Sequence, residues 1–261
     1  MLNRAFLQPG EGLQRTFAAV VLELETVAQC QSIEQVFDRL EEHQVTFRLD
    51  PSIRPSMVKG ATVSLGELGQ LRRINQVIRL GHVRRIESQS ITLEAGSVPT
   101  SPGHLHVHCA SAGLSDNAPK PIFTDDTIVL QPITRVSLSL SAGLIGVVEA
   151  SGRSATEKNR LCPPNMWFDT PFDWMRHLLT GMRTELEWRD APDVVAWVES
   201  SRLNLIKGLD QGPDQGAVAD LQGRFLTALF PALERFDDLT ANATPAERAR
   251  MFRGVPGSPG T

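Results

Sequence analysis

Apolar residues recur every three or four positions near the start of the chain and again through most of its last hundred residues. The N-terminal residues with this spacing are Leu13, Phe17, Val20, Val21, Leu24 and Val27. They would lie on one face of a helix. A second helix is predicted to begin at Ser32, which has Gln35 in the capping-box position. The best-marked helix covers residues 64–81, where a capping box opens the segment, five apolar residues form a stripe and a glycine closes it.

The middle of the chain shows short runs of alternating or continuous apolar residues instead. Strands are predicted at 45–49, 82–87, 90–94, 105–109 and 127–132. A helix should then begin at about Leu138, and the pattern stays helical to the end, with the last helix interrupted by Pro231. Helices, a strand-rich middle and a helical C-terminal third indicate an α/β or α+β protein, not an all-α one.

Composition narrows the class of protein without identifying it. The chain has 261 residues and a net charge of −4, which gives no electrostatic reason to expect nucleic acid or an anionic membrane as partner. No apolar run reaches the roughly 18 residues of a membrane span, and the N-terminus lacks the pattern of a signal peptide. The three cysteines are far apart and suit a reducing compartment. We therefore expect a cytoplasmic protein.

The stretch "PGHLHVHCASAGL" (102–114) holds the densest candidate chemistry, and three interpretations compete for it. His104, His106 and His108 would share one face of a strand and could ligate a metal. Same-side neighbours on a strand are about 7 Å apart, however, so one strand rarely supplies three ligands. Cys109 has no strong base beside it and is expected to be a small core residue.

The third interpretation is a buried strand that ends in a tight turn of very small residues. The turn would consist of Ala110, Ser111, Ala112 and Gly113. Small residues at the C-terminal end of a strand let a ligand approach the backbone, and in open α/β sheets ligands bind at that end. A plain tight turn without a ligand is the alternative.

The segments "FRLDPSIRPSM", "ATVSLGELGQLRRI", "VHCASAGL", "LQPI" and "EKNRLCPP" resemble FAD/NAD(P)-dependent oxidoreductases with two dinucleotide-binding domains, similar to flavin monooxygenases. The resemblance runs from Met1 to about Leu205. It implies a flavin-dependent NAD(P)H oxidoreductase that uses FAD and NAD(P), and a partial Rossmann-like sheet with a β-meander. It also implies that the turn at 110–113 lies beside the cofactor, with Gln131 and Pro132 near the isoalloxazine ring. Catalytic acids or bases are not implied, because the flavin does most of the chemistry.

The chain departs from this family in one important respect. Neither of the family's two glycine-rich fingerprints is present, and without them the pyrophosphate of a dinucleotide has no cradle. We therefore expect this chain to be the C-terminal portion of such an enzyme and inactive alone. Three explanations are open: a truncated gene, a misplaced start codon, or a subunit completed by a second polypeptide that supplies the N-terminal half. The alternatives are a non-enzymatic interaction module with an obligate partner and, more weakly, a metal-binding protein.

The resemblance and the composition together predict five segments. They are the remainder of the dinucleotide-binding region (1–150), a helical region (151–207), a linker (208–216), C-terminal helices (217–253) and a disordered tail (254–261).

Overall fold

The structure is a computed structural model that describes residues 1–8, 12–110, 119–135, 137–212 and 214–241. Its contacts divide the chain into two compact units, which are treated separately below. Unit 1 comprises residues 1–65 and 115–261, and unit 2 comprises residues 66–114. Unit 2 is therefore inserted into the sequence of unit 1.

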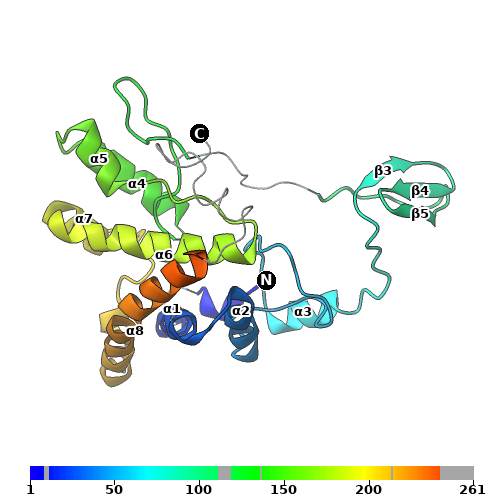
Figure 1. The fold of residues 1–261 in the computed structure, drawn as a ribbon, viewed down its shortest axis with the longest axis horizontal. Coiled ribbons are helices and arrows are strands. Elements are labelled where there is room, and N and C mark those ends of the chain that lie inside the picture. The colour runs from blue at the N-terminus through cyan, green and yellow to red at the C-terminus, as the bar shows by residue number, and fades with distance from the viewer. Residues whose placement is uncertain (9–11, 111–118, 136, 213, 242–261) are drawn as a thin grey trace. The chain divides into compact units, whose positions relative to one another are not determined.

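Unit 1 is mainly helical (Figure 1). Its elements are β1 (Leu2–Asn3), η1 (Arg4–Phe6), α1 (Leu13–Gln29), α2 (Ile33–Glu42), β2 (Thr62–Val63), α4 (Leu138–Glu149), α5 (Ala155–Leu161), α6 (Pro171–Glu187), η3 (Trp188–Asp190), α7 (Pro192–Ser200), η4 (Leu209–Gln211) and α8 (Gln215–Ala241). The elements of unit 2 are β3 (Val83–Ile86), β4 (Ser90–Leu93), β5 (Gly96–Pro99) and α3 (Leu65–Leu71), which begins at the boundary.

The main core of unit 1 lies between α1, α2, α6 and α8 (Figure 1). The predicted stripe of α1 is confirmed, since Val21, Leu24 and Val27 are fully buried. Helix α2 begins as predicted, with the Ser32 hydroxyl accepting a hydrogen bond from the Gln35 amide. Helix α2 thus forms where an amphipathic stripe and a cap coincide, whereas α1 follows Gly12 without a side-chain cap and depends on its buried stripe.

Helix α6 is buried on nearly every side and forms the centre of unit 1. Thr170 and Asp173 form a reciprocal capping box at its N-terminus, and Pro171 occupies the first turn, where its missing N–H costs nothing. A second core joins α4, α5 and α7 to the segment 122–133. Trp188, which directly follows α6, is part of this second core. Its indole N–H donates a hydrogen bond to the Leu161 carbonyl of α5 at 2.8 Å.

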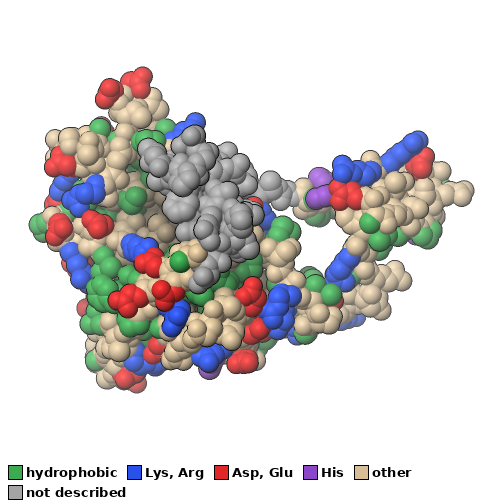
Figure 2. All heavy atoms as spheres, viewed as in Figure 1, with side chains coloured by type: hydrophobic (Ala, Val, Ile, Leu, Met, Phe, Trp, Pro, Cys, Tyr) green, Lys and Arg blue, Asp and Glu red, His purple; other side chains and the backbone are tan. Residues whose placement is uncertain are grey.

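Unit 2 contains an antiparallel meander in the order β3-β4-β5. The predicted strands at 82–87 and 90–94 are confirmed, and β5 adds a third strand where a turn was expected. Most side chains of the meander are exposed, including those of Val83 and Ile86. Leu93 is a buried exception. Figure 2 shows apolar side chains on the surface of this small sheet. Residues 66–110 thus bury little apolar area among themselves.

The helix predicted at 64–81 is wrong beyond Leu71. Of its apolar stripe only Leu68 is buried, while Ile74 is 61% exposed and Ile78 is 53% exposed. A short helix is marginal in water unless its apolar face packs against something, and two internal glycines weaken this one further. No described residue of unit 2 packs against most of this apolar stripe. The spacing of the apolar residues was therefore not enough to predict a helix over 64–81.

The buried strand predicted at 105–109 is also wrong. This segment has no regular structure, and the side chains of Leu105 and Val107 are 87% and 72% exposed. Cys109 is exposed and not a core residue. In addition, the segments 45–49 and 127–132 each contribute only one isolated bridge, through Thr46 and Ile128. Runs this short form strands only where a neighbouring strand pairs with them.

Pro231 does not interrupt the last helix, because α8 continues through it. The fold is therefore mixed helix and sheet with a helical C-terminal region. Among the described strands, parallel pairing is confined to β1 and β2, which have two residues each, so a Rossmann-like sheet is not seen there. The predicted tail (254–261) lies outside the described residues. None of the described helices combines the length and apolar character that a bilayer crossing demands.

Candidate functional site

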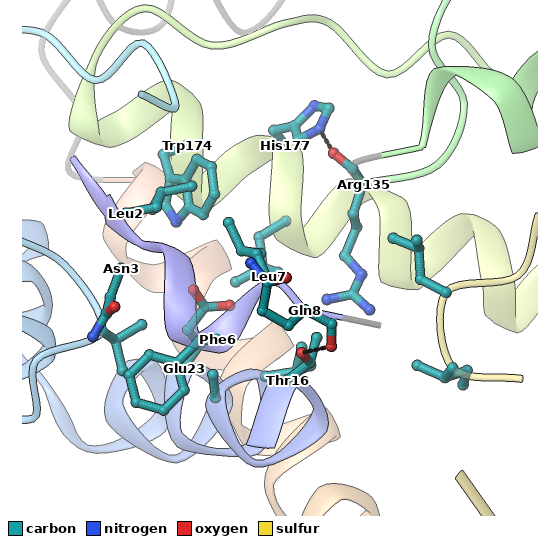
Figure 3. A pocket seen from close by; sticks show the side chains of 16 residues that line it. Leu2, Asn3, Phe6, Leu7, Gln8, Thr16, Glu23, Arg135, Trp174 and His177 are labelled. Atoms are coloured by element: carbon teal, nitrogen blue, oxygen red, sulfur yellow. Dashed lines mark hydrogen bonds between the residues drawn. The ribbon is translucent and has the colours of Figure 1, made fainter. Parts of the chain in front are cut away.

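A pocket of about 130 Å³ opens in unit 1 where the N-terminal segment meets α1 and α6. Its walls are mostly apolar and include Leu2, Phe6, Val20, Trp174 and Leu178 (Figure 3). Charged and polar groups from three parts of the chain project among these apolar side chains. A mostly apolar pocket with a few convergent polar groups is the usual form of a small-molecule site.

Glu23 on α1 is the most unusual residue of the pocket. It is only 8% exposed, and its carboxyl makes no hydrogen bond to any described residue. Burial raises the pKa of this carboxyl to about 7, against the opposing effect of the positive charge on Arg135. The side chain therefore carries a proton that can be lost near neutral pH.

Arg135 reaches the pocket because the chain before α4 passes very close to α6. A Cβ on Gly181 would collide with the Arg135 side chain and would lie 3.2 Å from the Arg135 backbone nitrogen, so glycine permits the approach. The Nε of Arg135 is buried without a hydrogen-bond partner and lies 3.9 Å from a Glu185 carboxylate oxygen. The guanidinium of Arg135 is close enough to lower the pKa of the Glu23 carboxyl, and in the view of Figure 3 Leu7 and Gln8 lie between the two groups.

Two aromatic side chains of α6 complete the polar part of the pocket. The ring nitrogens of His177 face the backbone carbonyls of Met166, at 2.9 Å, and of Arg135. Burial lowers the pKa of His177 to about 4, helped by the charges of Arg176 and Arg135 and opposed by the Met166 carbonyl. The indole nitrogen of Trp174 is buried without a partner. His177 thus serves to fix the backbone that carries Arg135, while Trp174 leaves a donor unused.

An unsatisfied buried polar group costs about 1–3 kcal/mol. Arg135 and Trp174 each leave such a group beside the pocket. A ligand with matching groups would recover part of that cost. The arrangement can bind a polar group on an apolar molecule, and Glu23 can hold or release a proton there.

The residues predicted to lie near a cofactor fall in both units. The side chain of Gln131 is held by Lys120, whose backbone N–H donates to Oε1 at 3.0 Å and whose carbonyl accepts from Nε2 at 2.7 Å. The Pro132 carbonyl accepts a hydrogen bond from the Asn165 amide at 2.7 Å. Gln131 and Pro132 therefore belong to an irregular segment of unit 1 that precedes α4. Ala110 is an exposed residue of unit 2, and Ser111, Ala112 and Gly113 lie outside the described residues.

The three histidines of the metal hypothesis lie in the irregular, exposed part of unit 2. The rings of His104 and His106 each contact the Thr100 hydroxyl, at 3.1 and 3.2 Å. Within the described residues no group of three or more His, Cys, Asp or Glu side chains could hold a metal ion.

Sequence reasoning missed every polar residue of the pocket. One signal was available, because Glu23 falls between Val20 and Val27 on the apolar face of α1, where a charge is out of place. Arg135 and His177 carried no such signal. Their roles depend on the approach of two distant segments at Gly181, which periodicity does not encode.

Comparison with known proteins gives relatives but no function. The chain is 40% identical over 210 residues, which is 80% of its length, to uncharacterized protein Rv2000 of Mycobacterium tuberculosis and uncharacterized protein Mb2023 of Mycobacterium bovis. It spans only 39% of the length of these curated relatives. No family model matches the sequence. No solved structure matches it either.

Proposed function

We propose that this chain forms the helical, substrate-binding part of a larger flavin-dependent NAD(P)H oxidoreductase. The pocket between α1 and α6 carries this proposal, because it offers an apolar space with a titratable carboxyl and a guanidinium at one place. The sequence resemblance supports the flavin part of the proposal. The greater length of the relatives supports a protein in which other segments bind the dinucleotides.

The N-termini of α4, α5 and α6 do not fit a dinucleotide pyrophosphate. That group needs free N–H groups at a helix N-terminus behind a glycine-rich turn. The first turn of α4 is instead capped by the Ser137 side chain, that of α5 by Ser154, and that of α6 by Thr170. A Rossmann-like sheet and the predicted cofactor contacts of residues 110–113, Gln131 and Pro132 therefore belong to the proposal for the longer protein.

The visible spectrum tests the proposal. The longer relative from Mycobacterium tuberculosis should purify with flavin absorption or gain it with added FAD, and NADH or NADPH should bleach it. This chain alone should stay colourless. A chimera in which this chain replaces the matched region of the relative should keep the flavin and its reduction. A relative that binds no FAD under any of these conditions would overturn the proposal.

A second candidate function, an interaction module, is favoured by the exposed apolar residues of unit 2. Ile74, Ile78, Val83, Leu105 and Val107 are all about half exposed or more. Apolar residues concentrated in one small unit favour a covering protein surface. Sedimentation of the chain over a range of concentrations tests this, since an obligate interface predicts self-association or aggregation. A chain that stays monomeric at high concentration argues against it.

A further inference from the structure

Two residues that line the pocket of unit 1 carry buried donors that make no hydrogen bond. They are Arg135 Nε, which lies 3.9 Å from a Glu185 carboxylate oxygen, and Trp174 Nε1. Glu23 adds a third donor whenever its carboxyl is protonated, which burial favours up to about pH 7 because it raises the pKa of that group. The polar group that best fits this set is therefore an acceptor with several lone pairs.

Three polar groups can be compared as occupants. An ammonium group has three donors and no acceptor, so it leaves Arg135 and Trp174 unpaired and repels the guanidinium. A single carbonyl or hydroxyl oxygen has too few lone pairs to serve three donors well. A carboxylate has two oxygens with about four lone-pair sites, and it gains a charge-assisted bond from Arg135.

The apolar part of the pocket limits the size of the ligand. The cavity measures about 130 Å³. An engineered cavity of about 150 Å³ in another protein holds a benzene molecule. Phe6, Val20 and Leu178 line the pocket and would contact a body of this size. The ligand is thus about as large as a benzene ring or a short alkyl chain.

We propose that this pocket binds a small apolar monocarboxylic acid, with the carboxylate held by Arg135, Trp174 and Glu23. The acid is a substrate only if the proposed oxidoreductase function holds, because its role in the reaction rests on that function. The binding itself requires only this chain.

Binding should depend on pH through Glu23. A carboxylate ligand is ionised above about pH 5, so the ligand itself does not titrate near neutrality. The charged groups facing Glu23 are Arg135 and, behind it, Glu185, with neutral His177 on α6. When Glu23 loses its proton it becomes a second negative charge beside the ligand. Affinity should therefore fall about tenfold for each pH unit above 7.

Isothermal titration calorimetry of the full 261-residue chain with benzoate tests the proposal. Benzyl alcohol and benzylamine serve as comparison ligands of the same size. Benzoate should bind at pH 6 and lose about tenfold in affinity per unit above pH 7, and the other two should bind more weakly. Glu23→Gln should keep benzoate binding and remove its pH dependence, since an amide N–H replaces the acid proton. Arg135→Met should weaken binding by about tenfold or more.

Matched controls separate these effects from general loss of structure. Glu25→Gln lies two residues further along α1, and Arg183→Met removes an arginine that pairs with Asp237. Both should leave benzoate binding unchanged. Benzylamine binding more tightly than benzoate, with affinity rising above pH 7, would overturn the proposal, and so would the failure of benzoate to bind a folded chain. If benzoate binds but the longer relative takes up no FAD, the acid site stands and the oxidoreductase proposal fails.

Discussion

Replacing Glu23 by glutamine should change how the stability of the protein depends on pH. The carboxyl titrates near 4.5 in the unfolded chain, and burial raises its pKa to about 7 in the folded chain. Between these values the folded chain binds more protons than the unfolded chain, so the free energy of unfolding falls as pH rises. A shift of this size corresponds to about 3 kcal/mol, lost between pH 4.5 and 7.

His177 acts in the opposite direction over nearly the same range. Its pKa falls from 6.5 in the unfolded chain to about 4 in the folded chain, mainly because of burial. Between these values the unfolded chain binds more protons, so the free energy of unfolding rises with pH, also by about 3 kcal/mol. The contributions of Glu23 and His177 should nearly cancel between pH 4.5 and 6.5.

Urea denaturation of the wild-type and Glu23→Gln proteins at pH 4.5, 5.5, 6.5 and 7.5 measures this directly. Subtraction of the two curves removes the contributions of all other groups, and the variant should gain about 3 kcal/mol relative to the wild type from the lowest to the highest pH. Glu25→Gln is the control, because Arg224 lowers the pKa of Glu25 and the relative change should have the opposite sign. A difference between Glu23→Gln and wild type that stays constant with pH would refute the burial of this carboxyl.

Three further predictions follow from packing. Gly181→Ala should lower the melting temperature because the added carbon collides with Arg135. Gly223→Ala on α8 should raise the melting temperature, because nothing lies within 4 Å of the added carbon and alanine favours a helix. Equal shifts for the two variants would contradict the close approach of Arg135 to Gly181. Ellman's reagent should titrate one thiol per native chain, that of Cys109, and three after denaturation, because the other two cysteines are buried. Leu179→Ala should cost about 2–5 kcal/mol in urea denaturation, since this side chain is fully buried, and a loss below 1 kcal/mol would place it outside the core.

The sequence predicted helices well where their partners lie in unit 1. The stripe of α1, the small-residue helix from Leu138 and the C-terminal helices all have neighbours that cover their apolar faces. The segment 64–81 has an equally clear stripe, but the described residues of unit 2 offer it no cover. Periodicity records what a segment could bury and does not show whether something is there to bury it.

The candidate site was harder to predict than the fold. Glu23 could have been noticed as a charge on an apolar face, but Arg135 enters the pocket only because Gly181 admits the chain before α4. Gln131 and Pro132 were predicted from the resemblance alone, whereas residues 110–113 were predicted also from their small side chains. Within unit 1 the structure gives Gln131 and Pro132 hydrogen bonds in an irregular segment, and their proposed place near a flavin stays a prediction.

The pairing of α1 with α8 has a consequence for how the protein is made. Arg224 on α8 binds Glu25 on α1 across a separation of 199 residues. At about 5–20 residues per second, a ribosome needs roughly 10–40 s to synthesise the intervening chain. Throughout that interval the apolar face of α1 has no α8 to pack against, and the main core cannot close. Nascent chains of this protein should therefore depend on chaperones until α8 has been synthesised.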